Sequence, residues 1–333
     1  MARVTVMGTG AWGTTFGRVL SDAGNVVKWW SFEEHVAEQI NTVRRNDAYL
    51  PGIELPTDAR AFTDPAEALA DAEFVVVALP AQTARSNYEV WGAAVPSGVP
   101  VITLMKGIEL GTGCTMAQVI EDVLGTPHDL VTAISGPNLA KEIAVRQPAA
   151  TVVAAGTREV AERVADLITT SYYRPYWTTD VVGVEVGGAV KNVVALANGM
   201  AAGLGFGENA QASLITRGLA EMTRLGVAMG GEPVTFLGLA GVGDLVATAT
   251  SPLSRNRTFG MALGEGHTVE EATAIAKQTA EGAKSAQPLV DLSARHGVSL
   301  PIAEGVVRVL AGELRPADLL AFFMQRETKA EFS

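Results

Sequence analysis

The sequence is poor in cysteine and in positive charge, and both shortages exclude classes of protein. Cys114 is the single cysteine in 333 residues, so an intramolecular disulfide and a cysteine-rich zinc site are impossible. The chain has 25 Lys and Arg against 36 Asp and Glu, which gives a formal net charge of −11. Because like charges repel, we expect neither nucleic acid nor an anionic membrane to be its main partner.

The sequence also lacks long uncharged runs and a leader peptide. Near the middle of the chain the longest uncharged stretch, 192–207, contains two Asn and four Gly and is shorter than the roughly 20 residues that a membrane helix needs. The N-terminal apolar run is interrupted by Gly8, Gly10 and Gly13 instead of ending in a small-residue cleavage site. We therefore expect a cytoplasmic protein without a membrane span or a signal peptide.

Histidine is scarce as well, and its spacing does not suggest a metal. The four histidines are far apart and show no paired spacing of the kind found in zinc-binding helices. We therefore expect them to be surface or packing residues, and we predict no metal site; they are His35, His128, His267 and His296.

What the chain does contain is enough apolar sequence for two domains. It is 48% hydrophobic and 18% charged, the composition of a globular protein, and its length suggests two domains at about 150 residues each. In the first half, short runs rich in Val and Ile alternate with segments of helical spacing, which predicts a doubly wound parallel sheet. The expected strands are 4–7, 26–30, 74–79, 101–104, 130–134 and 151–155, with 172–177 as a candidate last strand.

After about Trp177 the pattern becomes helical and β-branched runs are no longer prominent. We place the domain boundary within 178–184, so that residues 1–180 form a dinucleotide-binding domain and 181–333 a helical substrate domain. The helices expected in the second half are 184–204, 211–230, 269–280, 286–296 and 302–311.

A glycine motif follows the first predicted strand. Gly8, Gly10 and Gly13 have the spacing G-x-G-x-x-G and open a predicted helix. The first glycine permits a tight turn, the second lets the backbone approach a pyrophosphate, and the third allows close packing of helix on strand. The free N–H groups at the start of that helix favour a phosphate. The context predicts a dinucleotide site.

The second predicted strand leaves the choice between NAD(H) and NADP(H) open. An acidic residue usually ends this strand and contacts the adenosine ribose. Here the strand is followed by Ser31 and Phe32, with Glu33 and Glu34 just beyond. Charge therefore does not exclude the 2′-phosphate of NADP(H), which basic side chains in 44–45 can meet.

Further polar loops follow later strands, where ligands bind in open α/β sheets. They are 79–81, 105–109 and 135–142. Lys106, in the second of them, would on composition alone be a solvated lysine, but its place after a buried strand favours a role in the site. The Gly-Pro turn in the third loop offers backbone N–H groups to a polar substrate or to the nicotinamide.

Lys191 lies on an unusually apolar predicted helix. Its neighbours at three and four residues are Gly187, Gly188, Val194 and Ala195, which we expect to leave a groove beside the ammonium group. The helix alone fits two interpretations equally well: a lysine that reaches the surface along its apolar stem, or a buried lysine with a lowered pKa that transfers protons. The apolar flanks favour the second. Asn192 follows directly and can hydrogen-bond a hydroxyl group or the nicotinamide.

The last informative segment is glycine-rich and carries a cluster of donors. We expect Asp244 to lie in a turn, and Ser254, Arg255, Asn256 and Arg257 to form a compact group. An arginine fork with neutral donors around it matches a phosphate. In a chain this acidic, such a group is better explained by an anionic ligand than by a solvated surface.

Together these segments resemble the bacterial type of NAD(P)-dependent glycerol-3-phosphate dehydrogenase. The resemblance implies an N-terminal Rossmann domain, a C-terminal all-α domain, usually a homodimer, and interconversion of dihydroxyacetone phosphate and sn-glycerol 3-phosphate for phospholipid synthesis. It spans nearly the whole chain, through GTGAWG, YLPG, MKGIE, SGPNLAKE, GVEVGGAVKNVVA, GFGENAQASLITRGLAEM, GLAGVGDL, SRNRTFG and AEGAKSA.

The resemblance also implies roles for single residues. Lys191 is similar to the family's general acid/base, with Lys106, Asp244 and Asn192 around the reacting carbon. The implied substrate contacts are Lys106, Gly136, Asn138, Lys191, Asn192, Asp244, Ser254, Arg255 and Asn256. The implied cofactor contacts, beside the motif glycines, are Ala11, Trp12, Ser31, Lys106, Ala140, Arg255, Thr279 and Glu281.

Two positions depart from the family pattern, and two other functions stay open. Asn138 replaces the usual Ser or Thr, which affects one substrate hydrogen bond, and Ser31 replaces a common Arg or His, which affects cofactor preference. A β-hydroxyacid dehydrogenase of similar build would need a carboxylate site in place of the 254–257 cluster. A non-catalytic redox sensor would need no proton donor such as Lys191.

Overall fold

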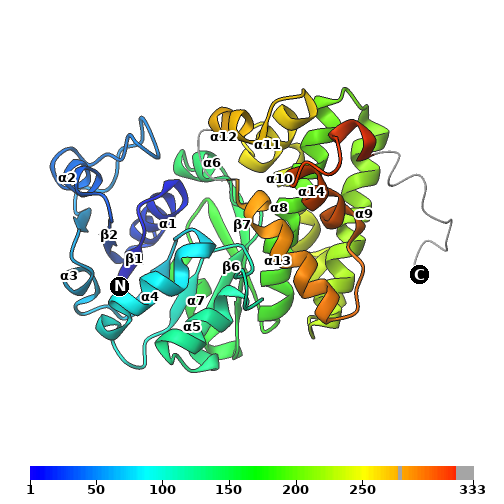
Figure 1. Ribbon diagram of the computed structural model, residues 1–333. Helices are drawn as coiled ribbons and strands as arrows, with labels where there is room; N and C mark the ends of the chain where they lie inside the picture. Colours follow the sequence, from blue (N-terminus) through cyan, green and yellow to red (C-terminus); the bar gives the residue numbers. More distant parts are fainter. Residues whose placement is uncertain (277–279, 320–333) are drawn as a thin grey trace.

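An eight-stranded sheet forms the first half of the computed structural model, which describes residues 1–276 and 280–319, and helices form the second half (Figure 1). The strand order is β3-β2-β1-β4-β5-β6-β7-β8, and the first six strands pair in parallel. This α/β class with a helical second half confirms the predicted fold class. The strands are β1 (Arg3–Met7), β2 (Val26–Trp30), β3 (Arg60–Phe62), β4 (Phe74–Val77), β5 (Val101–Thr103), β6 (Val131–Ser135), β7 (Ala149–Ala155) and β8 (Tyr173–Thr178).

Two features of the sheet differ from the prediction. β7 pairs antiparallel with β6, so the expectation of a parallel sheet is wrong at this strand. Its connection to β6 contains only the five-residue helix α6 (Ala140–Ala144), which reverses the chain without crossing the sheet, whereas a parallel neighbour needs a longer crossover. The strand β3 is absent from the prediction, because three residues at an edge are too few to show a pattern.

Helices cover both faces of the sheet and bury its apolar strands. The cover explains why these strands have no alternation of polar and apolar residues; all four residues of β4 are buried, for example. The helical segments of this half are α1 (Ala11–Asp22), α2 (Glu34–Val43), α3 (Pro65–Leu69), η1 (Ala81–Thr83), α4 (Ala84–Trp91), η2 (Gly92–Ala94), α5 (Met116–Leu124), η3 (His128–Leu130), α6 and α7 (Arg158–Ile168).

The second half is built around α8 (Val181–Gly203), which lies between the sheet and the outer helices (Figure 1). It is long and apolar enough to cross a membrane, but 94% of its most apolar window is buried inside the protein, as expected for a core helix. The other helical segments are α9 (Glu208–Ala228), η4 (Pro233–Leu237), η5 (Leu239–Gly243), α10 (Asp244–Thr250), α11 (Arg255–Gly264), α12 (Val269–Ala276), α13 (Glu281–Arg295) and α14 (Pro301–Leu310).

Small residues let α11 pack directly against α8. A Cβ atom on Gly260 would lie 2.0 Å from the carbonyl oxygen of Leu196, and one on Gly199 would lie 2.2 Å from that of Arg257. No side chain fits at such distances, so the two backbones are in contact. This close approach brings the start of α11 beside Asn192 in the middle of α8.

Candidate active site

The glycine motif forms the turn between β1 and α1. Gly8 has φ +126°, and a Cβ there would lie 2.5 Å from the carbonyl oxygen of Ala78; a Cβ on Gly13 would lie 2.2 Å from that of Gly8. A Cβ on Gly10 would meet nothing within 4 Å. The first and third glycines are therefore required by the fold, whereas the second faces open space, as the approach of a pyrophosphate requires.

Two unpaired groups at this turn fit a dinucleotide. The start of α1 receives no hydrogen bond from a capping side chain, so its N–H groups are available to an anion. The indole nitrogen of Trp12 is buried without a hydrogen-bond partner. A buried donor of this kind is usually satisfied by a ligand or by water. Ala11, the first residue of α1, lies beside it, and Ala140 lies next to α1 because the Ala140 carbonyl accepts a hydrogen bond of 3.3 Å from Thr15.

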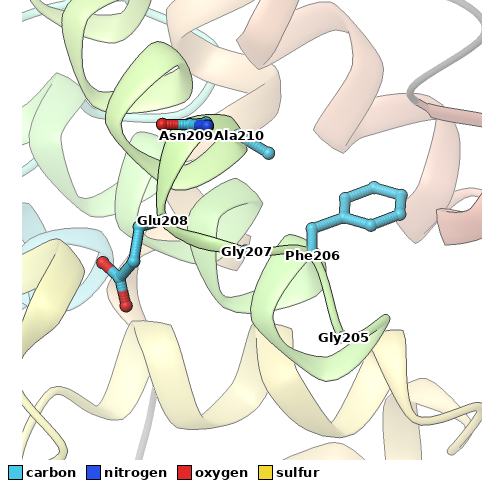
Figure 2. A pocket seen from close by; sticks show the side chains of 6 residues that line it. All are labelled: Gly205, Phe206, Gly207, Glu208, Asn209 and Ala210. Atoms are coloured by element: carbon cyan, nitrogen blue, oxygen red, sulfur yellow. The ribbon is translucent and has the colours of Figure 1, made fainter.

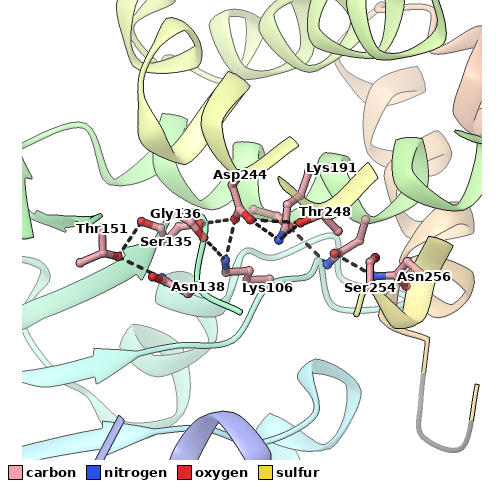
Figure 3. Close-up of polar contacts among 12 residues, drawn as sticks. Lys106, Ser135, Gly136, Asn138, Thr151, Lys191, Asp244, Thr248, Ser254 and Asn256 are labelled. Carbon is pink, nitrogen blue, oxygen red and sulfur yellow. Dashed lines mark hydrogen bonds and ion pairs between the residues drawn. The ribbon is translucent and has the colours of Figure 1, made fainter. Parts of the chain in front are cut away.

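A cluster of charged residues joins the two halves of the chain. Asp244 accepts hydrogen bonds from Lys106, with Nζ 2.6 Å from Oδ2, and from Lys191, with Nζ 2.5 Å from Oδ1. Figure 3 shows the carboxylate between the two ammonium groups. Lys106 also donates to the carbonyl of Gly136 at 3.1 Å, and Lys191 donates to Thr248 at 2.7 Å. The predicted catalytic residues therefore lie together, at the junction of the sheet and the helices.

Burial and opposing charge set the protonation of this cluster. The side chains of Lys191 and Asp244 are 8% and 1% exposed, and that of Lys106 is 15% exposed. Burial lowers the pKa of Lys191 to about 7, although Asp244 opposes the change. Burial also acts to raise the pKa of Asp244, but the two ammonium groups outweigh it and hold that pKa below its ordinary value. Near neutral pH, Lys191 can therefore both give and take a proton.

The glycines beside Lys191 do not leave an open groove, and that expectation is wrong. A Cβ on Gly188 would lie 3.0 Å from Ser135 Oγ and 3.3 Å from Lys106 Cγ, while one on Gly187 would lie 2.5 Å from the carbonyl oxygen of Ala240. The space is filled by the sheet domain on one side and by the backbone of η5 on the other. The small residues thus serve to bring the two lysines close to one carboxylate.

We predicted that Asp244 lies in a turn, and this is wrong: Asp244 is the first residue of a helix. It follows the five-residue π-helical segment η5 and opens α10. Thr248, one helical turn later, donates to the Asp244 carboxylate at 3.1 Å and accepts from Lys191. Sequence reasoning missed Thr248, although its spacing of four residues from Asp244 would have indicated it if the helix had been predicted.

The predicted phosphate cluster lies at the start of α11, where hydrogen bonds hold Ser254 and Asn256 in place. Ser254 caps the helix by accepting a hydrogen bond from the Arg257 N–H at 3.3 Å. Asn256 is buried, donates to Asn192 Oδ1 at 2.9 Å and accepts from the N–H of Gly282 at 2.8 Å. This bridge ties the cluster to Asn192, the residue next to Lys191. Arg255, in the first turn of α11, has an exposed side chain.

Asn138 also has protein partners. Its amide donates to Thr151 Oγ1 at 3.0 Å, and its carbonyl oxygen accepts from the Tyr173 hydroxyl at 3.1 Å. Thr151 donates in turn to the carbonyl of Ser135 at 3.0 Å. Residues of β6, β7 and β8 therefore hold the Asn138 side chain, and sequence reasoning missed Thr151 and Tyr173 because they are distant along the chain.

The remaining predicted cofactor residues are placed as follows. Ser31 is fully buried, accepts from Thr9 Oγ1 at 2.8 Å and donates to the carbonyl of Glu33 at 3.0 Å. Glu281 opens α13, and its Oε2 atom is buried without a hydrogen-bond partner, as expected for a group that meets a ligand. Thr279 lies outside the described residues.

A surface depression at the link between α8 and α9 is separate from the residues of the charged cluster (Figure 2). It is lined by residues 205–210, including Phe206, Glu208 and Asn209. The lining contains none of the predicted site residues, and its one charged side chain is acidic. The depression is therefore not suited to a phosphorylated substrate.

Comparisons with known proteins match both halves of the chain. Residues 3–161 match the family model of the NAD-dependent glycerol-3-phosphate dehydrogenase N-terminus, and 180–321 match that of its C-terminus. The chain is 52% identical to the NAD(P)+ glycerol-3-phosphate dehydrogenase of Streptomyces avermitilis and 53% identical to that of Thermobifida fusca, over 99% of this chain and 98% and 99% of those proteins. The crystal structure of glycerol-3-phosphate dehydrogenase from Coxiella burnetii has a TM-score of 0.93, 32% identity, and covers 98% of this chain and 99% of its own.

Proposed function

We propose that Lys191 is the general acid and base of this protein, which belongs to the NAD-dependent glycerol-3-phosphate dehydrogenase family. As a member of that family, it is an NAD(P)-dependent oxidoreductase that interconverts dihydroxyacetone phosphate and sn-glycerol 3-phosphate. The observation that carries this assignment is a buried ammonium group held 2.5 Å from a carboxylate that a second lysine shares. Proton transfer to the substrate oxygen needs a donor of this kind.

Each member of the cluster has a distinct part in this proposal. NAD(P)H, when bound, supplies the hydride that reduces the ketone carbon. Lys191 gives its proton from Nζ to the oxygen on that carbon as negative charge develops there, and takes a proton back in the reverse direction. Asp244 fixes the position of that ammonium group. Lys106 keeps a positive charge near the developing alkoxide.

We propose that the phosphate of the substrate is bound at the start of α11. Arg255 offers a bidentate guanidinium group, and the Asn256 bridge to Asn192 fixes its distance from Lys191. Backbone N–H groups in the first turn of α11 favour an anion. Holding the phosphate there orients the ketone toward the lysines.

The function is tested by following the absorbance of the reduced cofactor after each of two candidate substrates is added. On adding dihydroxyacetone phosphate to the protein with NADH or NADPH, we expect absorbance to fall, and a β-keto acid should leave it unchanged. A decrease with the β-keto acid alone would instead indicate a β-hydroxyacid dehydrogenase. If neither compound is reduced while the nucleotide still binds, the protein is a sensor and the proposal fails.

We further propose the division of the chain, its assembly and its cellular role. A boundary at 180/181 is supported by the end of β8 at Thr178 and the start of α8 at Val181. A homodimer, a cytoplasmic location and a role in phospholipid synthesis are supported by the family membership and by the single cysteine. Light scattering of the purified protein tests the dimer; a monomeric mass at micromolar concentration would contradict it.

A further inference from the structure

The end of β2 lies against the glycine turn, where the adenosine ribose of a dinucleotide is bound in this fold. Trp30, the last residue of β2, accepts a hydrogen bond from the N–H of Gly8 at 3.1 Å. Thr9 in the turn donates to Ser31 at 2.8 Å, and Asn46 donates to the carbonyl of Thr9 at 2.7 Å. The side chains that follow β2 therefore decide which ribose, with or without a 2′-phosphate, is accepted.

Ser31 does not provide that contact with its hydroxyl group. It is fully buried. Its hydroxyl group accepts hydrogen bonds from the Thr9 hydroxyl and from the Glu33 N–H, and donates one to the Glu33 carbonyl. Phe32 is 87% exposed and apolar. The first side chain after β2 that can bond a ribose hydroxyl is that of Glu33, which stands before α2 and makes no capping bond to it.

Asn46 and Tyr49 belong to the segment that folds over the glycine turn. The Glu33 carboxylate beside the Tyr49 hydroxyl group, together with burial, raises the pKa of Tyr49. In that same segment, buried Asn46 has a side-chain oxygen without a hydrogen-bond partner. An acceptor carboxylate and an unpaired acceptor oxygen fit the hydroxyl groups of a ribose and repel a phosphate.

Arg44, the residue that follows α2, donates its hydrogen bonds to backbone carbonyls. The Arg44 guanidinium group donates to the carbonyls of Ile40 and Thr57, each at 3.0 Å, and to that of Asn41. It thereby satisfies carbonyls at the end of α2. Arg45 is exposed and is the cation to test beside it.

We propose that Glu33 makes this enzyme selective for NADH over NADPH, by accepting a hydrogen bond from the ribose 2′-hydroxyl and repelling a 2′-phosphate. The inference rests on the proposed function, since it assigns the cofactor of that same reaction. It predicts that selectivity is a property of binding and is present without substrate.

Calorimetric titration of the protein with NADH and with NADPH, without substrate and at one ionic strength, tests the proposal. We expect NADH to bind at least about tenfold more tightly, and Glu33→Gln to reduce that ratio severalfold by strengthening NADPH binding. Phe32→Arg, which adds a cation beside the ribose, should reduce it further. Glu38→Gln, an exposed acid on the same helix, is the matched control and should leave the ratio unchanged.

The outcomes separate this inference from the proposed function. Equal or tighter binding of NADPH by the wild-type protein overturns the inference but leaves the dehydrogenase intact, as does an unchanged ratio in Glu33→Gln. NADPH binding that is lost in Arg45→Gln, with NADH binding retained, would assign selectivity to the arginine and also overturn it. Binding of neither nucleotide would overturn the proposed function itself.

Discussion

The two halves of the molecule build their parts of the site in different ways. In the sheet half, the dinucleotide turn consists of consecutive residues and uses the backbone, as the close contacts of Gly8 and Gly13 show. In the helical half, the reacting groups are side chains, and Asp244 meets a lysine 138 positions earlier in the chain. A backbone site thus needs only a local turn, whereas a side-chain site needs the packing of both halves.

The comparison extends to the way in which charge is handled. At the glycine turn the free N–H groups of α1 carry only partial charge. In the cluster, full charges are buried and must compensate one another: two ammonium groups share one carboxylate that is 1% exposed. Removing one charge from such a buried group leaves another without a partner, so substitutions there should have larger effects.

The largest effect should come from Lys191→Met, which keeps the volume but removes the proton donor. We expect turnover to fall by about 10²–10⁴-fold, while calorimetric titration shows NADH binding within about threefold of wild type. The matched control is Lys28→Met, at a half-buried lysine of β2 that donates to the carbonyl of Ala70 at the end of α3. Near-normal turnover of Lys191→Met would remove Lys191 from its assigned role.

The pH dependence should differ between the two reaction directions. Lys191 has a pKa of about 7 because burial disfavours its charged form, so it is protonated below that pH and neutral above it. Reduction of the ketone needs the proton and should slow about tenfold per pH unit above 7; oxidation of the alcohol needs the neutral amine and should quicken as pH rises through 7. Rate profiles in both directions measure this. Parallel profiles would contradict the assignment.

Two glycine substitutions should distinguish a glycine required for protein stability from one required for cofactor binding. Gly13→Ala places a methyl group against the backbone of Gly8 and should destabilise the protein by about 1–3 kcal/mol. Gly10→Ala has free space and should leave Tm unchanged while weakening NADH binding. Thermal unfolding and titration check both, and a similar loss of Tm in the two variants would contradict the distinction.

A buried acid of the helical half has a structural task. Glu221 accepts a hydrogen bond of 2.9 Å from the N–H of Ile302 at the start of α14, and burial raises its pKa to about 8. The folded protein then holds a proton that the unfolded chain, with a pKa near 4.5, has lost. Stability should therefore fall as pH rises from about 4.5 to 8.

Glu221→Gln should flatten that decline, by on the order of 1 kcal/mol per pH unit. Thermal unfolding at pH 5, 6.5 and 8 measures the slope. Glu67→Gln, at an exposed position of α3, should leave the slope as in wild type. If Glu221→Gln declines as steeply as the wild-type protein, the contribution of this carboxyl group is smaller than its burial indicates.

Sequence patterns predicted most of the architecture because they report local preferences. Runs of Val and Ile marked six of the strands, an aromatic segment marked β8, and helical spacing marked α8 and α9. The pattern did not show the direction of β7, which depends on how its connection packs, or β3, which is too short. It also placed Asp244 in a turn, because glycines at 238–243 suggested one.

For the site, the residues themselves determined the glycine turn and the apolar surroundings of Lys191, since both depend on neighbours within a few positions. Only the tertiary structure decided that Lys106 and Lys191 share the Asp244 carboxylate. It also decided that other segments occupy the space beside Gly187 and Gly188, and that Asn256 donates a hydrogen bond to Asn192. These contacts join segments far apart in the chain. Their distances are set by how helix and sheet pack, which no local pattern contains.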